Sequence, residues 1–149
     1  MDLTARGRVV FDTTACIYYL ERPAVDPRCA MLLPVVAAAQ AGTVDLVIST
    51  VTVTELLTGP LRSGNREEEA AVRLFMGLLC RVAPVDFAVA ERAAALRAEH
   101  GLRTPDALIC ATAACAAAVV VGNDLRWKHI GSGIRYVHID EMVAASGDP

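Results

Sequence analysis

The segment from Arg103 to Asp124, RTPDALICATAACAAAVVVGND, constrains the fold of this chain more than any other stretch of its sequence. No charged residue lies between Asp106 and Asp124. A segment this apolar is expected in the protein core, so its two acids are expected where the core meets water. Thr104 and Pro105 predict the start of a helix, with Thr104 as the N-cap and Asp106 in the first turn.

The end of the same segment predicts a strand. Val119 to Val121 form a short β-branched run that leads into Gly122, Asn123 and Asp124. We therefore expect a buried helix followed by a buried strand. In an open α/β sheet, ligand sites lie where strands run out into the loops that begin helices. Both acids of the segment are thus expected at such a site.

The rest of the chain alternates between short apolar runs and stretches with helical spacing. Strands are expected at residues 8–12, 45–49, 81–85 and 134–139, and helices at 13–20, 31–41, 50–58, 67–80, 87–100 and 140–145. Gly59 and Pro60 are expected to end the third helix, and Asp86 to cap the fifth. The order β-α-α-β-α-α-β-α-α-β-β predicts a single α/β domain, residues 1–149, with a mainly parallel sheet.

Composition and charge narrow the class of protein. Hydrophobic residues make up 54% of the chain, but the one candidate membrane span, residues 107–122, is shorter than the roughly 20 residues that a spanning helix needs. Residues 1–12 lack the apolar core of a signal peptide, so a cytoplasmic protein is expected. The five cysteines form no CxxC pair, which indicates reduced thiols rather than a disulfide framework. A net charge of −3 excludes a broad basic surface that grips nucleic acid through charge alone.

Acidic side chains follow the expected strands at several points. Asp12 closes the first strand, Glu55 lies in the helix after the second, and Asp106 and Asp124 bound the apolar segment. Right-handed crossovers place the carboxyl ends of parallel strands on one side of the sheet, where these four acids can converge. Gathered carboxylates repel one another unless a cation neutralises them, and an oxygen-only site suits Mg²⁺ or Mn²⁺ and phosphate chemistry. Taken singly, each acid also fits a helix cap, a turn or the surface, but their joint placement favours a metal site.

Four segments, VVFDTTACIYYL, STVTVTELLTG, RTPDALICATA and VVVGNDLRW, carry a family resemblance in this order. Together they resemble the PIN domain family, and within it most closely the VapC-like toxin ribonucleases of type II toxin-antitoxin systems. The similarity spans residues 8–139. It implies a three-layer α/β/α fold with a mainly parallel central sheet. It also implies a metal-dependent endoribonuclease that cleaves structured RNA such as tRNA or rRNA, leaving a 5′-phosphate and a 3′-hydroxyl.

The resemblance assigns roles to individual residues. The positions that match the family's catalytic, metal-binding acids are Asp12, Glu55, Asp106 and Asp124. Thr13 and Asn123 match polar positions that contact the metal ligands or the substrate. Arg126 stands where many relatives carry a fifth acid, so the number of Mg²⁺ or Mn²⁺ ions, one or two, stays open. Arg126 is also a candidate contact for RNA phosphates, whereas Trp127 is expected to pack against the sheet rather than stack on a base.

The same resemblance implies partners and leaves alternatives. VapC-like toxins are held inactive by a small antitoxin protein and tend to form homodimers. A housekeeping PIN ribonuclease without an antitoxin, or a non-catalytic PIN-like RNA-binding module, remains the alternative. A haloacid-dehalogenase-type phosphatase would need a second acid where Thr14 stands and a lysine in the middle of the chain, and Lys128 is the only lysine.

Overall fold

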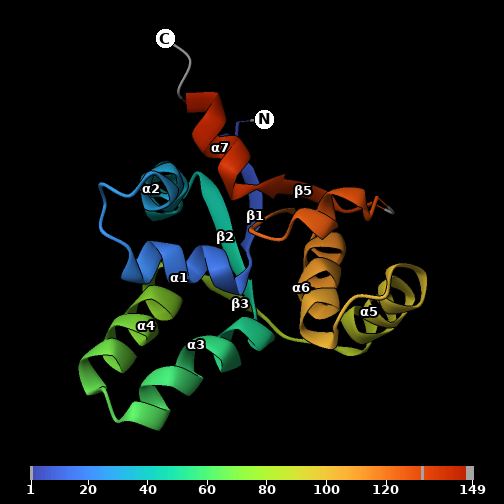
Figure 1. The fold of residues 1–149 in the computed structure, drawn as a ribbon, viewed down its shortest axis with the longest axis horizontal. Coiled ribbons are helices and arrows are strands. Elements are labelled where there is room, and N and C mark those ends of the chain that lie inside the picture. Colours follow the sequence, from blue (N-terminus) through green and yellow to red (C-terminus); the bar gives the residue numbers. More distant parts are fainter. Residues whose placement is uncertain (1, 132, 147–149) are drawn as a thin grey trace.

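A five-stranded, all-parallel sheet forms the centre of the computed structural model, which describes residues 2–131 and 133–146 (Figure 1). Its strands are β1 (Gly7–Phe11), β2 (Val44–Ser49), β3 (Arg81–Ala83), β4 (Val119–Gly122) and β5 (Arg135–His138). They lie in the order β3-β2-β1-β4-β5, and every neighbouring pair is parallel. The α/β class and the parallel sheet expected from the sequence are therefore confirmed.

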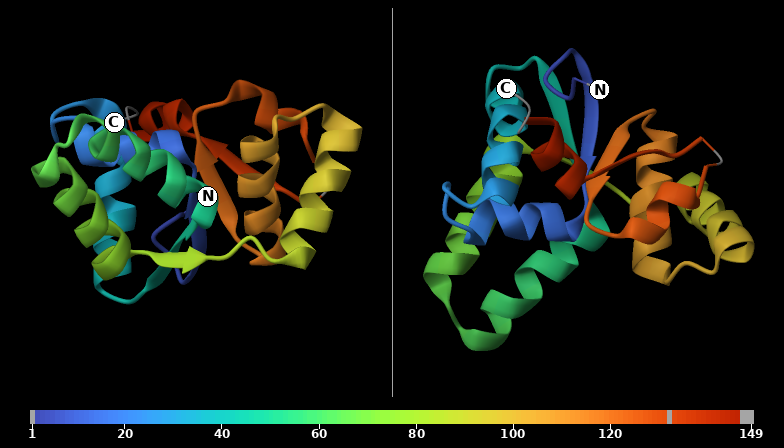
Figure 2. Two further views of the ribbon diagram at one scale, coloured as in Figure 1. Left: turned by 90° about the horizontal axis from the view of Figure 1, so that it is seen from below. Right: turned by 45° about the horizontal axis from the view of Figure 1, so that its top comes forward.

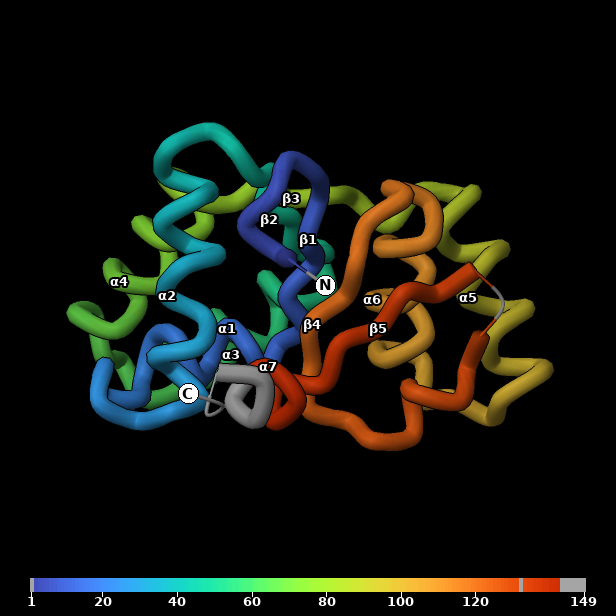
Figure 3. Tube along the Cα trace, turned by 90° about the horizontal axis from the view of Figure 1, so that it is seen from above, coloured from blue at the N-terminus to red at the C-terminus, as the bar shows by residue number. Residues whose placement is uncertain are grey.

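Helices cover both faces of this sheet, which gives the expected three layers (Figures 2 and 3). One face packs against α1 (Thr13–Glu21), α2 (Pro27–Gln40), α3 (Thr50–Ser63), α4 (Arg66–Leu79) and α7 (Ile139–Ser146). The other packs against α5 (Phe87–His100), α6 (Thr104–Cys115) and the 3-10 helix η1 (Leu125–His129). No helix in the described ranges is long and apolar enough to cross a membrane.

The alternation of side chains along the strands produces two separate cores. In β1, Val9 and Phe11 point into the core beneath α1 and α2, whereas Val10 points into the core beneath α5 and α6. In β4, Val120 likewise shares the second core with α6. Strands that are buried on both faces read as continuous apolar runs, which is why the sequence located them.

Two helix boundaries lie about one turn or more from the predicted positions. Gly59 and Pro60 do not end α3, which continues to Ser63 and ends at Gly64 with a φ of +70°. Pro60 is buried within the helix, and α3 packs against α4, so tertiary packing outweighs the missing backbone N–H. The second helix begins earlier than expected, at Pro27, where the Asp26 side chain caps it.

Two arginines fasten the turn between α6 and β4. Ala117 in this turn has a φ of +51°, and the carbonyl groups around it lie beyond the end of the helix. Arg8 of β1 donates to the Ala116 carbonyl at 3.0 Å, and Arg135 of β5 donates to the Ala117 carbonyl at 2.7 Å. Because β1 and β5 flank β4, these contacts hold the α6-β4 unit in register with both neighbouring strands.

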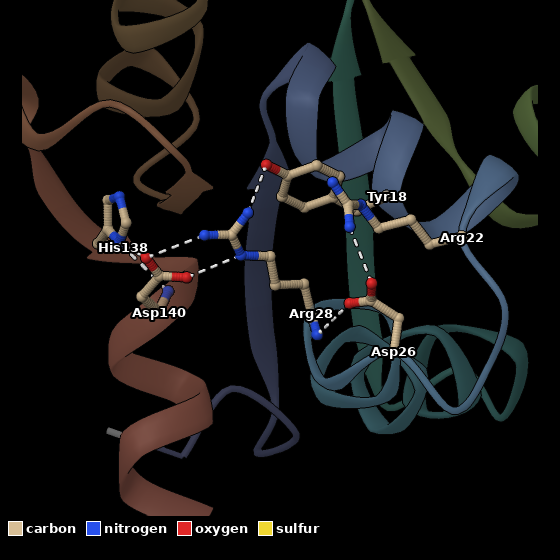
Figure 4. A network of polar contacts seen from close by, with 6 residues as sticks. All are labelled: Tyr18, Arg22, Asp26, Arg28, His138 and Asp140. Carbon is tan, nitrogen blue, oxygen red and sulfur yellow. Dashed lines mark hydrogen bonds and ion pairs between the residues drawn. The ribbon is translucent and has the colours of Figure 1, made fainter.

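A polar network attaches α7 to the helices on its side of the sheet (Figure 4). The Arg28 guanidinium of α2 pairs with Asp140 of α7 at 2.9 Å and donates to the Tyr18 hydroxyl of α1 at 3.2 Å. The Asp140 backbone N–H donates to His138 Nδ1 at 3.2 Å. This network ties the end of β5, and with it the edge of the sheet, to α1 and α2.

Candidate active site

Asp12 sits between three elements, at the end of β1, the start of α1 and the end of β4. Its Oδ1 accepts a hydrogen bond from the Ala15 backbone N–H at 2.6 Å, which caps α1. Its Oδ2 accepts from the Asn123 backbone N–H at 3.2 Å, and its own N–H donates to the Val121 carbonyl at 2.9 Å. Both carboxylate oxygens therefore accept a backbone hydrogen bond, and only 5% of the residue is exposed.

The surroundings of Asp12 make its negative charge unfavourable. Burial raises the pKa of this carboxyl to about 6, although the hydrogen bonds from Ala15 and Asn123 act in the opposite direction. The charges of Asp106 and Glu55 contribute to this raised pKa. Both acids therefore lie close enough to Asp12 to repel its negative charge.

Asp124 belongs to the same group of charges. The buried thiol of Cys110, one turn after Asp106 in α6, has its pKa raised to about 12, first by burial and then by the charges of Asp106, Asp12 and Asp124. The charges of these three carboxylates thus all act on one side chain of α6. The structure brings all four predicted acids to the carboxyl side of the sheet, as the right-handed crossovers suggested.

Glu55 is held by Thr13. The Thr13 hydroxyl donates to Glu55 Oε1 at 2.8 Å and lies 3.2 Å from the Thr52 hydroxyl, so it connects α1 to α3. Ser49 caps α3 through the Val51 N–H, which sets where Glu55 falls on the helix. Thr13 thus lies beside one of the predicted acids, and its role as a contact of the metal ligands or the substrate stays a prediction.

Asp106 and Asp124 are each paired with an arginine. Arg103 Nε donates to Asp106 Oδ2 at 3.2 Å, within the first turn of α6. Arg103, not Thr104, occupies the N-cap position, and it makes no capping hydrogen bond through its side chain. The prediction of a Thr104 cap was wrong because Thr104 and Pro105 are already helical, and the chain before them is extended at Arg103.

Arg126 folds back on Asp124 in a two-pronged contact. Its Nε lies 3.0 Å from Oδ1 and 3.1 Å from Oδ2, its Nη2 lies 2.5 Å from Oδ2, and its backbone N–H donates to Oδ1 at 2.9 Å. These hydrogen bonds and the positive charge hold the pKa of Asp124 below its usual range. The remaining pair on this turn joins Lys128 to Glu141 of α7, away from Asp124.

Two residues that sequence reasoning missed shape the site. Gly122 leaves room for Asp12, because a Cβ at residue 122 would lie 2.5 Å from Asp12 Oδ2. The Tyr136 hydroxyl of β5 accepts the Asp124 backbone N–H at 3.0 Å, and burial raises its pKa. The sequence does contain a signal for Gly122, because this glycine closes a β-branched run just before two polar residues. Nothing in the sequence pairs Tyr136 with Asp124 before the strand order is known.

Trp127 packs into the core, as predicted. It is 3% exposed, and its ring centroid lies 5.6 Å from that of Tyr136. Its indole Nε1 has no hydrogen-bond partner among the described residues. A side chain in this position supports the loop that carries Asp124 and is not available to stack on a base.

The carboxylate oxygens of the four acids are suitable ligands for a hard divalent cation. The side chains are not, however, oriented to hold one in this structure. All four acids offer oxygen, and the crowding of charge around Asp12 favours a bound cation. In the described ranges, however, no three His, Cys, Asp or Glu side chains are arranged to hold a metal ion. Glu55, Asp106 and Asp124 each point to a partner within the chain instead.

These features define an α/β/α protein with an acidic site at the carboxyl ends of its parallel strands. The chain belongs to the PIN domain family, since the sequence model of the PIN domain matches residues 9–133. PIN domains are nucleases. A comparison with curated proteins gives no significant match.

Solved structures with the same fold include components of toxin-antitoxin complexes. VapBC2 from Rickettsia felis, bound to a promoter DNA fragment, matches with a TM-score of 0.72 and 18% identity, over 88% of this chain and 98% of that one. DNA-bound VapBC from Salmonella typhimurium matches with a TM-score of 0.72 and 23% identity, over 89% and 98%. FitAcB from Neisseria gonorrhoeae matches with a TM-score of 0.68 and 22% identity, over 88% and 97%. At these identities the likeness concerns the fold.

Proposed function

We propose that this chain is a Mg²⁺- or Mn²⁺-dependent endoribonuclease whose metal ligands and catalytic acids are Asp12, Glu55, Asp106 and Asp124. The observation that carries the proposal is the state of Asp12, a buried carboxylate whose pKa is raised to about 6 by burial and by the charges of Asp106 and Glu55. A divalent cation would offset this repulsion. Membership of a nuclease family supports the same conclusion.

Each side chain has a task in this proposal. Two backbone N–H groups hold Asp12 in one orientation, so this proposed ligand is fixed before a cation binds. Thr13 orients Glu55 through its hydroxyl, and Asn123 contributes its backbone N–H to Asp12. A divalent cation held by the four acids would supply an activated water and would stabilise negative charge on the phosphate.

We further propose that the chain acts as the toxin of a toxin-antitoxin pair in the cytoplasm. The similar solved structures are described as VapBC, FitAcB and toxin-antitoxin complexes, which supports an antitoxin protein as partner. Structured RNA such as tRNA or rRNA is the proposed substrate and a homodimer the proposed assembly, both from the resemblance to VapC-like ribonucleases.

Nuclease activity can be tested with the purified chain and total RNA. We expect cleavage in 5 to 10 mM Mg²⁺ or about 1 mM Mn²⁺, the range in which such loosely held cations bind, and no cleavage in EDTA. The expected products carry a 5′-phosphate and accept a 3′-ligated adapter. Cleavage that persists in EDTA would rule out the metal-dependent mechanism.

The toxin role needs a separate experiment in cells. Induced expression of the wild-type chain is expected to arrest bacterial growth, whereas expression of Asp106→Asn is expected to be harmless. Co-expression of a small protein encoded beside this chain should relieve the arrest. Unimpaired growth together with RNA cleavage by the purified chain would favour the housekeeping ribonuclease.

A further inference from the structure

Three of the four acids in the candidate site are held by partners of their own chain. The Arg126 guanidinium contacts both carboxylate oxygens of Asp124, a contact that we call the fork. Arg103 contacts Asp106, and the Thr13 hydroxyl donates to Glu55. Asp12 alone has no side-chain partner among the described contacts and is held by backbone N–H groups. The directions of the acids therefore reflect these partners.

The two arginines supply as much charge as one divalent cation. Four ionised carboxylates carry four negative charges, and the Arg103 and Arg126 guanidinium groups bring two positive charges to them. The charge of Asp106, in addition to that of Asp124, acts on Arg126, so this guanidinium lies in the field of both acids. Neither arginine is locked in place, because their side chains are 74% and 69% exposed.

We propose that Arg103 and Arg126 are built-in competitors of the divalent cation, which hold Asp106 and Asp124 until the cation takes these carboxylates. The inference rests on the proposed metal-dependent function. In this exchange the cation replaces an arginine as the partner of a carboxylate. A carboxylate that turns toward the cation releases its guanidinium into solvent. Arg126 is the stronger competitor because it contacts both oxygens of Asp124, whereas Arg103 makes a single contact.

The exchange explains two features together. It accounts for a site in which four acids gather although no three of the described side chains are arranged as metal ligands. It also gives a physical role to Arg126, which stands where related chains are expected to carry an acid. An internal cation at this position lowers the affinity for metal instead of adding a ligand.

Mn²⁺ binding to the full-length chain, measured by isothermal titration calorimetry without RNA, tests the proposal. Arg126→Gln removes the charge and the fork, and we expect its Mn²⁺ affinity to exceed that of the wild type by about fivefold, the upper range for an exposed ion pair. Arg126→Lys keeps the charge without the fork and should fall in between. Arg103→Gln should gain about twofold, as suits a single exposed contact.

Lys128→Gln is the matched control. It removes one positive charge from the same turn, but Lys128 pairs with Glu141 and not with an acid of the site. Its Mn²⁺ affinity should stay within about twofold of the wild type, because exposed charges at this range are screened by salt. A gain equal to that of Arg126→Gln would show a general charge effect and overturn the proposal.

The outcomes separate the inference from the function on which it rests. Tighter Mn²⁺ binding by Arg126→Gln than by the wild type and by Lys128→Gln supports the inference. Equal or weaker binding by Arg126→Gln, with measurable binding by the wild type, overturns the inference and leaves the metal-dependent function standing. If neither the wild type nor any arginine variant binds Mn²⁺, the inference and the proposed function both fail. Melting curves of each variant verify that it is folded.

Discussion

Replacing Asp12 by Asn is expected to stabilise the metal-free chain at neutral pH. Asp12 is 5% exposed, and burial, together with the charges of Asp106 and Glu55, raises its pKa from the ordinary 3.8 to about 6. A carboxyl with a raised folded pKa stabilises the fold below the unfolded value, and this contribution is lost as pH rises through the folded value. At about 1.4 kcal/mol per pH unit, the ionised carboxylate lowers the free energy of unfolding by about 3 kcal/mol at pH 7.5.

The substitution itself loses one hydrogen bond. Asn keeps an oxygen for the Ala15 N–H but presents an amide N–H to the Asn123 N–H, which costs about 1 kcal/mol. The net gain in the free energy of unfolding is therefore about 2 kcal/mol at pH 7.5. At pH 4.5 the carboxyl is protonated in the folded wild type but largely ionised in the unfolded chain, which leaves a gain of about 1 kcal/mol for the variant. The lost hydrogen bond offsets this gain, so the difference between variant and wild type is expected to be close to zero.

Urea unfolding in EDTA, followed by the fluorescence of the single, buried Trp127, measures this difference at both pH values. Asp86→Asn is the control, since Asp86 also caps a helix through its side chain but is exposed. It should show no gain at pH 7.5. The reasoning is wrong if Asp12→Asn is less stable than the wild type at pH 7.5, or if the difference is the same at both pH values.

Three further predictions follow from the contacts in the site. Gly122→Ala places a Cβ 2.5 Å from Asp12 Oδ2 and should lower the free energy of unfolding by about 2 kcal/mol in urea titrations, with loss of RNA cleavage; wild-type stability would contradict the close approach. Thr13→Val removes the donor to Glu55 and should slow cleavage about tenfold with little change in the melting temperature; unchanged cleavage would separate Thr13 from the site. Mn²⁺ at 100 times its dissociation constant should stabilise the wild type by about 2.7 kcal/mol in thermal melts. Asp106→Asn should be stabilised much less, and an equal gain in both proteins would place the ion elsewhere.

Local sequence patterns were sufficient to locate most of the elements and the four acids. The continuous apolar run from Val119 to Val121 predicted a strand that is buried on both faces, and β4 is such a strand. Asp86 predicted the start of α5, which the structure confirms. The expected position of Asp12 at a strand end was also right, and its additional role as the cap of α1 uses the same side chain.

The details that depend on strand order could not be predicted. Gly122 matters because β4 lies beside β1, which brings Asp12 against its Cα. Tyr136 reaches the Asp124 N–H because β5 lies on the other side of β4. Both contacts join residues that are distant in sequence or become neighbours only once the sheet forms.

Two local conformations also escaped prediction. Arg126 lies two residues from Asp124, but the sequence does not distinguish a guanidinium that folds back on this acid from one that extends to a phosphate. Pro60 has the local chemistry of a helix end, and yet the packing of α3 against α4 keeps it helical. The local sequence alone therefore does not decide either conformation.

The measurement that tests the central claim most directly is the rate of RNA cleavage by Asp106→Asn beside the wild type, at saturating enzyme and Mn²⁺. Asp106 lies in the first turn of α6, is half-buried and contacts only the exposed Arg103 in the described hydrogen bonds, so the variant is expected to fold. We predict a loss of at least about a hundredfold in rate, as is usual for removing a group that stabilises the reacting charge. Cleavage by folded Asp106→Asn at the wild-type rate would contradict the assignment of the acidic site as the nuclease centre.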